Sequence, residues 1–138
     1  MTQKYYLDTC IWRDYFENRS DRFRPLGDWA FTLLSNIVQN EDLVLYSDLT
    51  IQELNKDLNH KKIKEALSIV PEQLLIKVNV LPIQFKEAIS LSRKHKIPAN
   101  DALHYILAKD NNAILVTRDK HFYELNDKMM IKKPEDLI

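Results

Sequence analysis

Residues 113–119, Ala-Ile-Leu-Val-Thr-Arg-Asp, form a short apolar run that ends in a hydroxyl and an acid. The start of the chain shows a similar pattern, because Tyr5-Tyr6-Leu7 is followed by Asp8 and Thr9. Short apolar runs bounded by polar residues are typical of buried parallel strands. Since the carboxyl ends of parallel strands share one edge of a sheet, Asp8 and Asp119 are expected at that edge, where α/β domains bind ligands.

Strand patterns alternate with helical patterns along the whole chain. Strands are predicted at residues 4–8, 43–46, 76–80 and 113–116, with a short fifth at 129–131. Helices are predicted at residues 9–17, 26–39 and 61–70, from just after Ser47-Asp48 to about Leu58, and after Pro82 and Pro98. The helix after Pro82 is expected to bury its apolar residues Phe85, Ala88, Ile89 and Leu91. This alternation predicts a single three-layer α/β/α domain over residues 1–138, with a central parallel sheet of four to five short strands.

The composition is that of an ordinary globular protein, with 45% hydrophobic and 29% charged residues. No apolar run approaches the roughly 20 residues that span a bilayer, and the N-terminus does not read as a signal peptide. The single cysteine, Cys10, cannot form an internal disulfide and fits a reducing compartment. We therefore expect a cytoplasmic protein with no membrane partner.

Charge and glycine content exclude several functions. The 20 basic and 20 acidic residues give zero net charge, which argues against nucleic-acid binding mainly by phosphate neutralisation. An enzyme whose metal ions meet the phosphate directly is not excluded. The only glycine is Gly27, whereas P-loops and dinucleotide fingerprints need several glycines near the phosphates. Nucleotide-binding loops of both kinds are therefore ruled out.

Two further acids, Glu53 and Asp101, fall in the early turns of predicted helices. Each of the four acids also has a local explanation. Asp8 could cap the helix that follows it, Asp101 could complement a helix dipole, and Asp119 could shape a turn. Glu53 fits a capping box in Thr50-Ile51-Gln52-Glu53. No one of these residues alone indicates a function.

Taken together, the four acids predict a metal site, because a parallel sheet brings them to one edge where they would repel each other without a cation. An all-oxygen site suits Mg²⁺ or Mn²⁺, which can activate water and stabilise charge on a phosphate. Thr9, Asn100 and Thr117 are expected to orient the carboxylates or metal-bound water. The histidines at 60, 95, 104 and 121 lack zinc-like spacing, and His104 and His121 are expected at the surface or just behind the ligands.

Four segments resemble the signature segments of PIN domains: residues 5–9 (YYLDT), 50–54 (TIQEL), 98–104 (PANDALH) and 115–122 (LVTRDKHF). The resemblance covers essentially the whole chain and implies a Mg²⁺- or Mn²⁺-dependent ribonuclease. It includes VapC-type toxins, which implies a small antitoxin partner and a homodimer. Asp8, Glu53, Asp101 and Asp119 map onto the metal-binding, catalytic acids, and Thr117 maps onto the hydroxyl that supports them.

One position departs from the family pattern. Some relatives carry another acid two residues after the fourth one, where this chain has His121. The number of metal ions, one or two, is therefore left open. Contacts with RNA are expected from basic residues near the site, with Arg13 and Arg118 as the first candidates.

Several alternatives stay open. The chain could be a housekeeping PIN-domain nuclease that processes RNA, or an inert PIN-like binding module. A haloacid-dehalogenase-like phosphatase is disfavoured because Cys10 stands where that class needs a second aspartate. The aromatic residues Trp12, Tyr15, Phe16 and Trp29 could belong to the core or to a partner surface.

Overall fold

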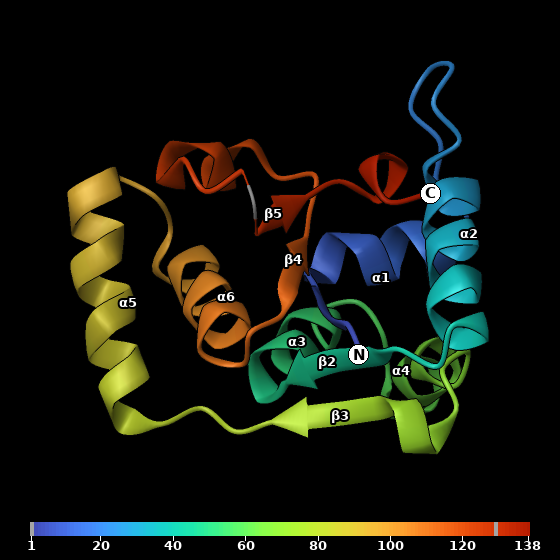
Figure 1. The fold of residues 1–138 in the computed structure, drawn as a ribbon, viewed down its shortest axis with the longest axis horizontal. Coiled ribbons are helices and arrows are strands. Elements are labelled where there is room, and N and C mark those ends of the chain that lie inside the picture. Colours follow the sequence, from blue (N-terminus) through green and yellow to red (C-terminus); the bar gives the residue numbers. More distant parts are fainter. Residues whose placement is uncertain (1, 129) are drawn as a thin grey trace.

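Five parallel strands form one sheet in the computed structural model, which describes residues 2–128 and 130–138. The strands are β1 (Lys4–Leu7), β2 (Leu43–Ser47), β3 (Leu75–Val78), β4 (Ile114–Val116) and β5 (Ile131–Lys132). They lie in the order β3-β2-β1-β4-β5, so β1 is central (Figure 1). Tyr6 pairs with Leu45 on one side, and Leu7 pairs with Val116 on the other.

Helices cover both faces of this sheet. They are α1 (Thr9–Phe16), α2 (Leu26–Gln39), α3 (Asp48–Leu54), α4 (His60–Leu67), α5 (Pro82–His95) and α6 (Ala99–Asp110), with short 3₁₀ turns η1 (Glu72–Leu74), η2 (Lys120–Leu125) and η3 (Pro134–Asp136). Figure 1 shows α1 and α2 on one side of the sheet and α5 and α6 on the other. Within the described residues, no helix has the length and apolarity that crossing a bilayer requires.

Two apolar cores lie on the two faces, as strand alternation requires. Tyr6, Leu45 and Leu115 point into the core that α5, α6 and η2 complete. Leu7, Val44 and Val116 point into the core shared with α1, α2 and α4. The predicted three-layer α/β/α arrangement and its parallel sheet are confirmed.

Most predicted boundaries differ from the structure by a few residues. The helix predicted after Ser47-Asp48 extends only to Leu54 instead of about Leu58, and the helix predicted at 61–70 is α4, capped by the side chain of Asn59. The strand predicted at 76–80 is β3. Of the fifth strand predicted at 129–131, Met129 lies outside the described residues, and the observed strand is β5.

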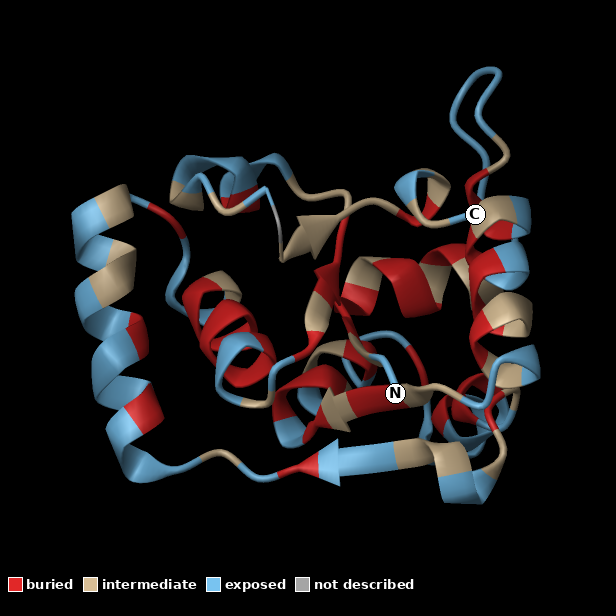
Figure 2. Ribbon diagram, in the orientation of Figure 1, coloured by how far each residue is buried: buried red, intermediate tan, exposed pale blue. Residues whose placement is uncertain are grey.

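The prediction for the apolar side of α5 was wrong in part. Ala88 is buried and Leu91 packs against the core, but Phe85 and Ile89 are 52% and 47% exposed. Figure 2 shows the contrast between α5, which is largely exposed, and α6, which is largely buried. The reason is that α5 lies outside α6, so only a narrow stripe of it meets the core.

The aromatic residues near the N-terminus divide between core and periphery. Trp12 is fully buried in the core, whereas Tyr15 and Phe16 are half-buried. The ring of Tyr15 stacks on Phe31, and that of Trp29 lies under the guanidinium of Arg118. Of these four aromatic residues, only Trp12 is therefore fully part of the apolar core.

The single glycine fixes a projecting loop, residues 18–25, at the start of α2 (Figure 1). The Gly27 N–H donates to the Arg19 carbonyl at 2.8 Å. A Cβ at Gly27 would lie 2.6 Å from Cα of Asn18, closer than any side chain tolerates. Glycine is needed here for close approach of two backbone segments.

Candidate metal centre

The carboxyl-terminal edge of the sheet carries a small cleft of about 180 Å³, lined by Asp8, Thr9, Cys10, Arg13, Glu53, Lys56, Asp101 and Asp119. All four predicted acids are among these residues. Asp8 directly follows β1 and Asp119 lies three residues beyond β4, whereas Glu53 comes from α3 and Asp101 from the first turn of α6. Parallel topology thus brings together residues that are up to 111 positions apart in the sequence.

Asp8 occupies the centre of this edge and has two structural tasks. Its Oδ1 accepts a hydrogen bond from the Thr9 N–H at 2.8 Å, so it caps α1 as its local sequence suggests. Its Oδ2 accepts from Thr117 Oγ1 at 2.8 Å and from Cys10 Sγ at 3.3 Å. Burial and the nearby Asp8 raise the pKa of the Cys10 thiol well above its usual value, so this thiol is a neutral neighbour.

Thr117 connects the ends of the two central strands. Its hydroxyl donates to Asp8 and accepts from the Asp119 N–H at 3.0 Å. Asp119 in turn caps η2, because its Oδ1 accepts from the His121 N–H at 2.9 Å. One hydroxyl therefore fixes the position of two of the acids.

Glu53 is not part of a capping box, which corrects the local alternative. The helix α3 starts at Asp48, its capping box is formed by Ser47 and Thr50, and Glu53 lies near its other end. The Oε1 atom of Glu53 accepts from Thr9 Oγ1 and from His104 Nε2, both at 2.6 Å. Burial opposes ionisation of Glu53, but the hydrogen bond from His104 and that from Thr9 outweigh it and lower the pKa of this carboxyl.

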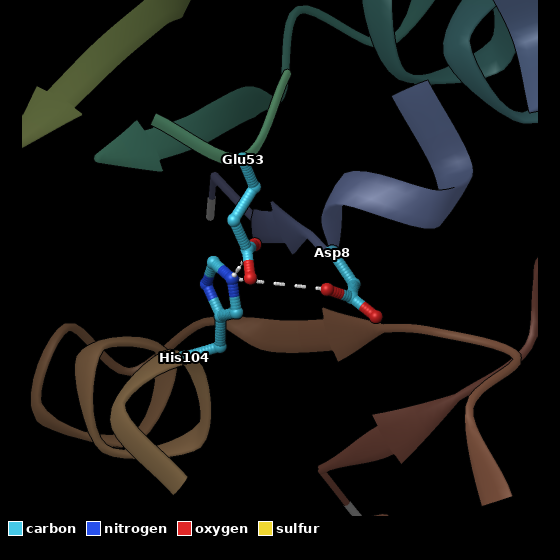
Figure 3. Close-up of side chains that lie close together, drawn as sticks. All are labelled: Asp8, Glu53 and His104. Atoms are coloured by element: carbon cyan, nitrogen blue, oxygen red, sulfur yellow. Dashed lines mark hydrogen bonds and ion pairs between the residues drawn. The ribbon is translucent and has the colours of Figure 1, made fainter. Parts of the chain in front are cut away.

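His104 is completely buried, on the inner face of α6, between the acids and the core. Its Nε2 faces Glu53 (Figure 3). The distance from Nε2 to Asp8 Oδ1 is 3.9 Å. Its Nδ1 lies 2.7 Å from the hydroxyl of Tyr6. The sequence prediction allowed a place at the surface, which is wrong. The spacing Asp101-x-x-His104, which puts both on one helix face, is a signal that could have indicated its proximity to the site.

Asp101 and Asp119 form the other half of the cleft with His121. The His121 Nδ1 lies 3.0 Å from Asp101 Oδ2 and 3.1 Å from Asp119 Oδ1. Burial, followed by the charges of Asp119 and Asp8, raises the pKa of Asp101 from 3.8 to about 6. The hydrogen bond to Asp101 and the charge of Asp119 raise the pKa of His121.

The donor set fits a hard divalent cation. Two groups of ligand atoms, one from Asp8, Glu53 and His104 and one from Asp101, Asp119 and His121, each lie within 4.8 Å of one another. The raised pKa of Asp101 means that ionisation of this carboxyl beside Asp119 and Asp8 is unfavourable without a cation. Mg²⁺ and Mn²⁺ favour such carboxylate oxygens.

Two other predicted site residues, Thr9 and Arg13, do lie at the cleft. Thr9 bonds Glu53 inside the cleft, and Arg13 lies at its rim, where it donates to the Glu53 carbonyl at 2.6 Å and to Asp57 at 2.9 Å. Lys56, which the sequence reasoning missed, also lines the cleft.

Two expectations need correction. Asn100 is exposed and lines a separate cavity beside α5, so it does not orient the carboxylates. Arg118 is largely buried, with its side chain only 12% exposed, and pairs with Asp14 at 3.2 Å and Glu135 at 2.8 Å. Its Nε and Nη1 atoms are therefore engaged in tertiary structure, and its Nη2 atom is buried, so the guanidinium is not presented to RNA in this arrangement.

The fold and the cleft define a parallel α/β protein with an acidic, cation-attracting centre at the carboxyl ends of its strands. The PIN domain family model matches residues 5–128. The chain therefore belongs to the PIN domain family. No curated protein matches it at a significant level.

Solved structures with the same fold cover nearly the whole chain. The crystal structure of VapBC2 from Rickettsia felis bound to a promoter DNA fragment has a TM-score of 0.66 and 18% identity, covering 95% of this chain and 98% of that one. A toxin–antitoxin complex from Klebsiella pneumoniae has a TM-score of 0.61 and 16% identity, covering 94% and 97%. FitAcB from Neisseria gonorrhoeae has a TM-score of 0.62 and 18% identity, covering 96% and 99%.

Proposed function

We propose that this protein is a Mg²⁺- or Mn²⁺-dependent endoribonuclease and the toxin of a toxin–antitoxin pair. The observation that carries the proposal is the convergence of Asp8, Glu53, Asp101 and Asp119 on one small cleft. Their membership of a PIN domain supports assigning this cleft to phosphodiester hydrolysis.

The carboxylates of Asp8, Asp101 and Asp119 would hold the cation, with Glu53 as a direct ligand or as a ligand of its water. A bound divalent ion supplies a more acidic water and stabilises negative charge on the phosphate. The two halves of the cleft allow one or two ions, and His121 stands beside the second half. No side chain of the cleft is assigned as a general base, since a water bound to the cation would already be more acidic.

Arg13 and Lys56 are the cationic residues that line the cleft. Arg13 is held in place by Asp57 and by the Glu53 carbonyl, so its guanidinium is oriented before RNA arrives. Lys56 is exposed and adds a second positive charge. Since the chain has zero net charge, attraction of RNA phosphates would be local to this rim.

The toxin assignment is supported by the solved structures of similar fold, one of which is described as a toxin–antitoxin complex. For this chain we propose a small antitoxin protein as partner, a homodimeric state and a cytoplasmic location. Exposed apolar side chains on and before α5, including Leu81, Ile83 and Phe85, offer surface that an assembly could bury. Sedimentation of the purified chain, alone and with a co-expressed neighbouring gene product, tests the two assembly states.

Cleavage of a fluorescent single-stranded RNA in Mn²⁺ tests the enzymatic proposal. The wild type should cut internal bonds, chelation should stop it, and Asp8→Asn or Asp101→Asn should lower the rate at least 100-fold in a folded protein. The matched control is Glu87→Gln, which neutralises an exposed acid on α5 outside the cleft. Wild-type turnover in Asp8→Asn would refute the assignment of the site.

Expression in cells separates the toxin from the other PIN-domain roles. A toxin should arrest growth, the arrest should need Asp8, and a small protein encoded next to it should relieve the arrest. RNA cleavage without growth arrest would indicate a housekeeping nuclease. Absence of both cleavage and metal binding would indicate an inert binding module.

A further inference from the structure

A buried chain of hydrogen bonds runs from the core to the candidate metal centre. It links Ser47 at the end of β2, Tyr6 in β1, His104 in α6 and Glu53 in α3. The Tyr6 hydroxyl lies 2.7 Å from Ser47 Oγ and 2.7 Å from His104 Nδ1. The side chains of Ser47, Tyr6 and His104 are all inaccessible to solvent.

Counting protons along this chain assigns a direction to each bond. Ser47 Oγ is completely buried, so its own proton must find an acceptor within the protein. Among the described contacts of this hydroxyl, the acceptor is the Tyr6 oxygen. The Tyr6 proton is then directed to His104 Nδ1, since its other neighbour, Thr50 Oγ1, lies at 3.5 Å. Leaving a buried polar group unpaired is unfavourable, which favours this complete set of bonds.

The tautomer of His104 follows from this direction. If Nδ1 accepts a hydrogen bond from the Tyr6 hydroxyl, the proton of the neutral imidazole is on Nε2. Nε2–H then donates to Glu53 Oε1 at 2.6 Å, and Thr9 donates to the same oxygen. Both donors hold Oε1, so Oε2 is the atom of this carboxylate that can face a cation in the cleft.

We propose that His104 is a positioning residue, which holds Glu53 through Nε2–H in a tautomer fixed by Tyr6 and Ser47. The role of Glu53 towards a cation rests on the proposed function, whereas the tautomer does not. His104 is not itself a metal ligand, because Nε2 carries a proton and has no free lone pair for a metal. Groups that orient a ligand in this way typically change metal affinity about 10–100-fold when removed.

Nitrogen NMR of the imidazole in the metal-free wild type tests the tautomer directly. Protonated Nε2 and unprotonated Nδ1 are expected. Tyr6→Phe, which keeps the ring but removes the donor, should shift the Nδ1 resonance. A proton on Nδ1 of neutral His104, or protons on both nitrogens at neutral pH, would overturn the inference.

Mn²⁺ affinity, measured by titration calorimetry, tests the consequence. His104→Gln keeps an N–H donor of similar reach, whereas His104→Leu has a similar volume and no donor. We expect about 10–100-fold weaker binding for His104→Leu and recovery to within about threefold for His104→Gln. Equal affinities of the two folded variants, or a direct Mn–imidazole bond to His104 in the wild type, would overturn the inference. A wild type that binds no Mn²⁺ would contradict the proposed function instead, and the tautomer measurement would still decide the role of His104.

Discussion

Replacing Asp101 with asparagine should stabilise the metal-free protein, although it removes a residue on which the proposed activity depends. Asp101 lies in the first turn of α6 with its side chain 15% exposed, facing Asp119 and Asp8. Burial and these two charges raise its pKa from 3.8 to about 6. The folded protein therefore carries an ionised group at neutral pH in a place that disfavours it.

The magnitude follows from the pKa. A value raised by about 2 corresponds to roughly 3 kcal/mol between the two protonation states. Partial access of solvent and the loss of the hydrogen bond to His121 reduce this figure, so we expect Asp101→Asn to stabilise the metal-free protein by about 1–2 kcal/mol. For a domain of this size, that gain raises the melting temperature by about 3–8 °C.

The stabilisation by Asp101→Asn should depend on pH in a definite direction. Since the folded pKa of Asp101 lies above the unfolded one, ionisation of this group destabilises the fold, and the penalty develops as pH rises from 3.8 to about 6. The difference in melting temperature between Asp101→Asn and the wild type should be small at pH 4 and complete above pH 7. Glu87→Gln, outside the cleft, should show no such trend.

Thermal melts with and without Mn²⁺ complete the test. A cation at about 100 times its dissociation constant should stabilise the wild type by about 2.7 kcal/mol, whereas Asp101→Asn should respond much less. The difference in melting temperature between Asp101→Asn and the wild type should therefore become smaller or change sign in Mn²⁺. An Asp101→Asn variant that is less stable than the wild type without metal at pH 7.5 would refute the electrostatic reasoning.

Three further substitutions test the scaffold around the cleft. Thr117→Val removes the hydroxyl that connects two of the acids and should destabilise the protein by about 1–3 kcal/mol in urea, while Thr117→Ser stays close to the wild type. Gly27→Ala should lower the melting temperature by several degrees, because the new methyl group meets the Asn18 backbone; an unchanged melt would show that the loop can move. Arg118→Ala leaves buried Asp14 without its cation and should cost about 3 kcal/mol in a denaturant titration, and a loss of RNA affinity with no loss of stability would contradict this assignment.

The sequence alone was sufficient to predict the fold and the gathering of the four acids at one edge of the sheet. Asp8 immediately follows its strand, and parallel topology then dictates which edge it shares with Asp119. The local pattern around Thr50 was ambiguous because two motifs overlap there. Thr50 can start a capping box with Glu53 or close one with Ser47, and the choice depends on where the preceding strand ends.

What the sequence did not reveal depends on rotation about helices and on contacts between distant residues. Asn100 and Asp101 are neighbours, but one residue turns a helix by about 100°, so Asn100 faces the cavity beside α5 while Asp101 faces the cleft. Arg118 was expected near RNA because it adjoins Asp119, yet its partner Asp14 is 104 residues away in the chain. The burial of His104 likewise follows from packing between α6 and β1.

We propose that the acids at the sheet edge hold a divalent cation. An anomalous difference map from crystals soaked in millimolar Mn²⁺ at pH 7.5 tests this claim most directly. We predict a manganese peak between the carboxylates of Asp8, Asp101 and Asp119, with oxygen distances of about 2.0–2.2 Å. An empty cleft at this concentration, with manganese bound elsewhere or not at all, would contradict the claim.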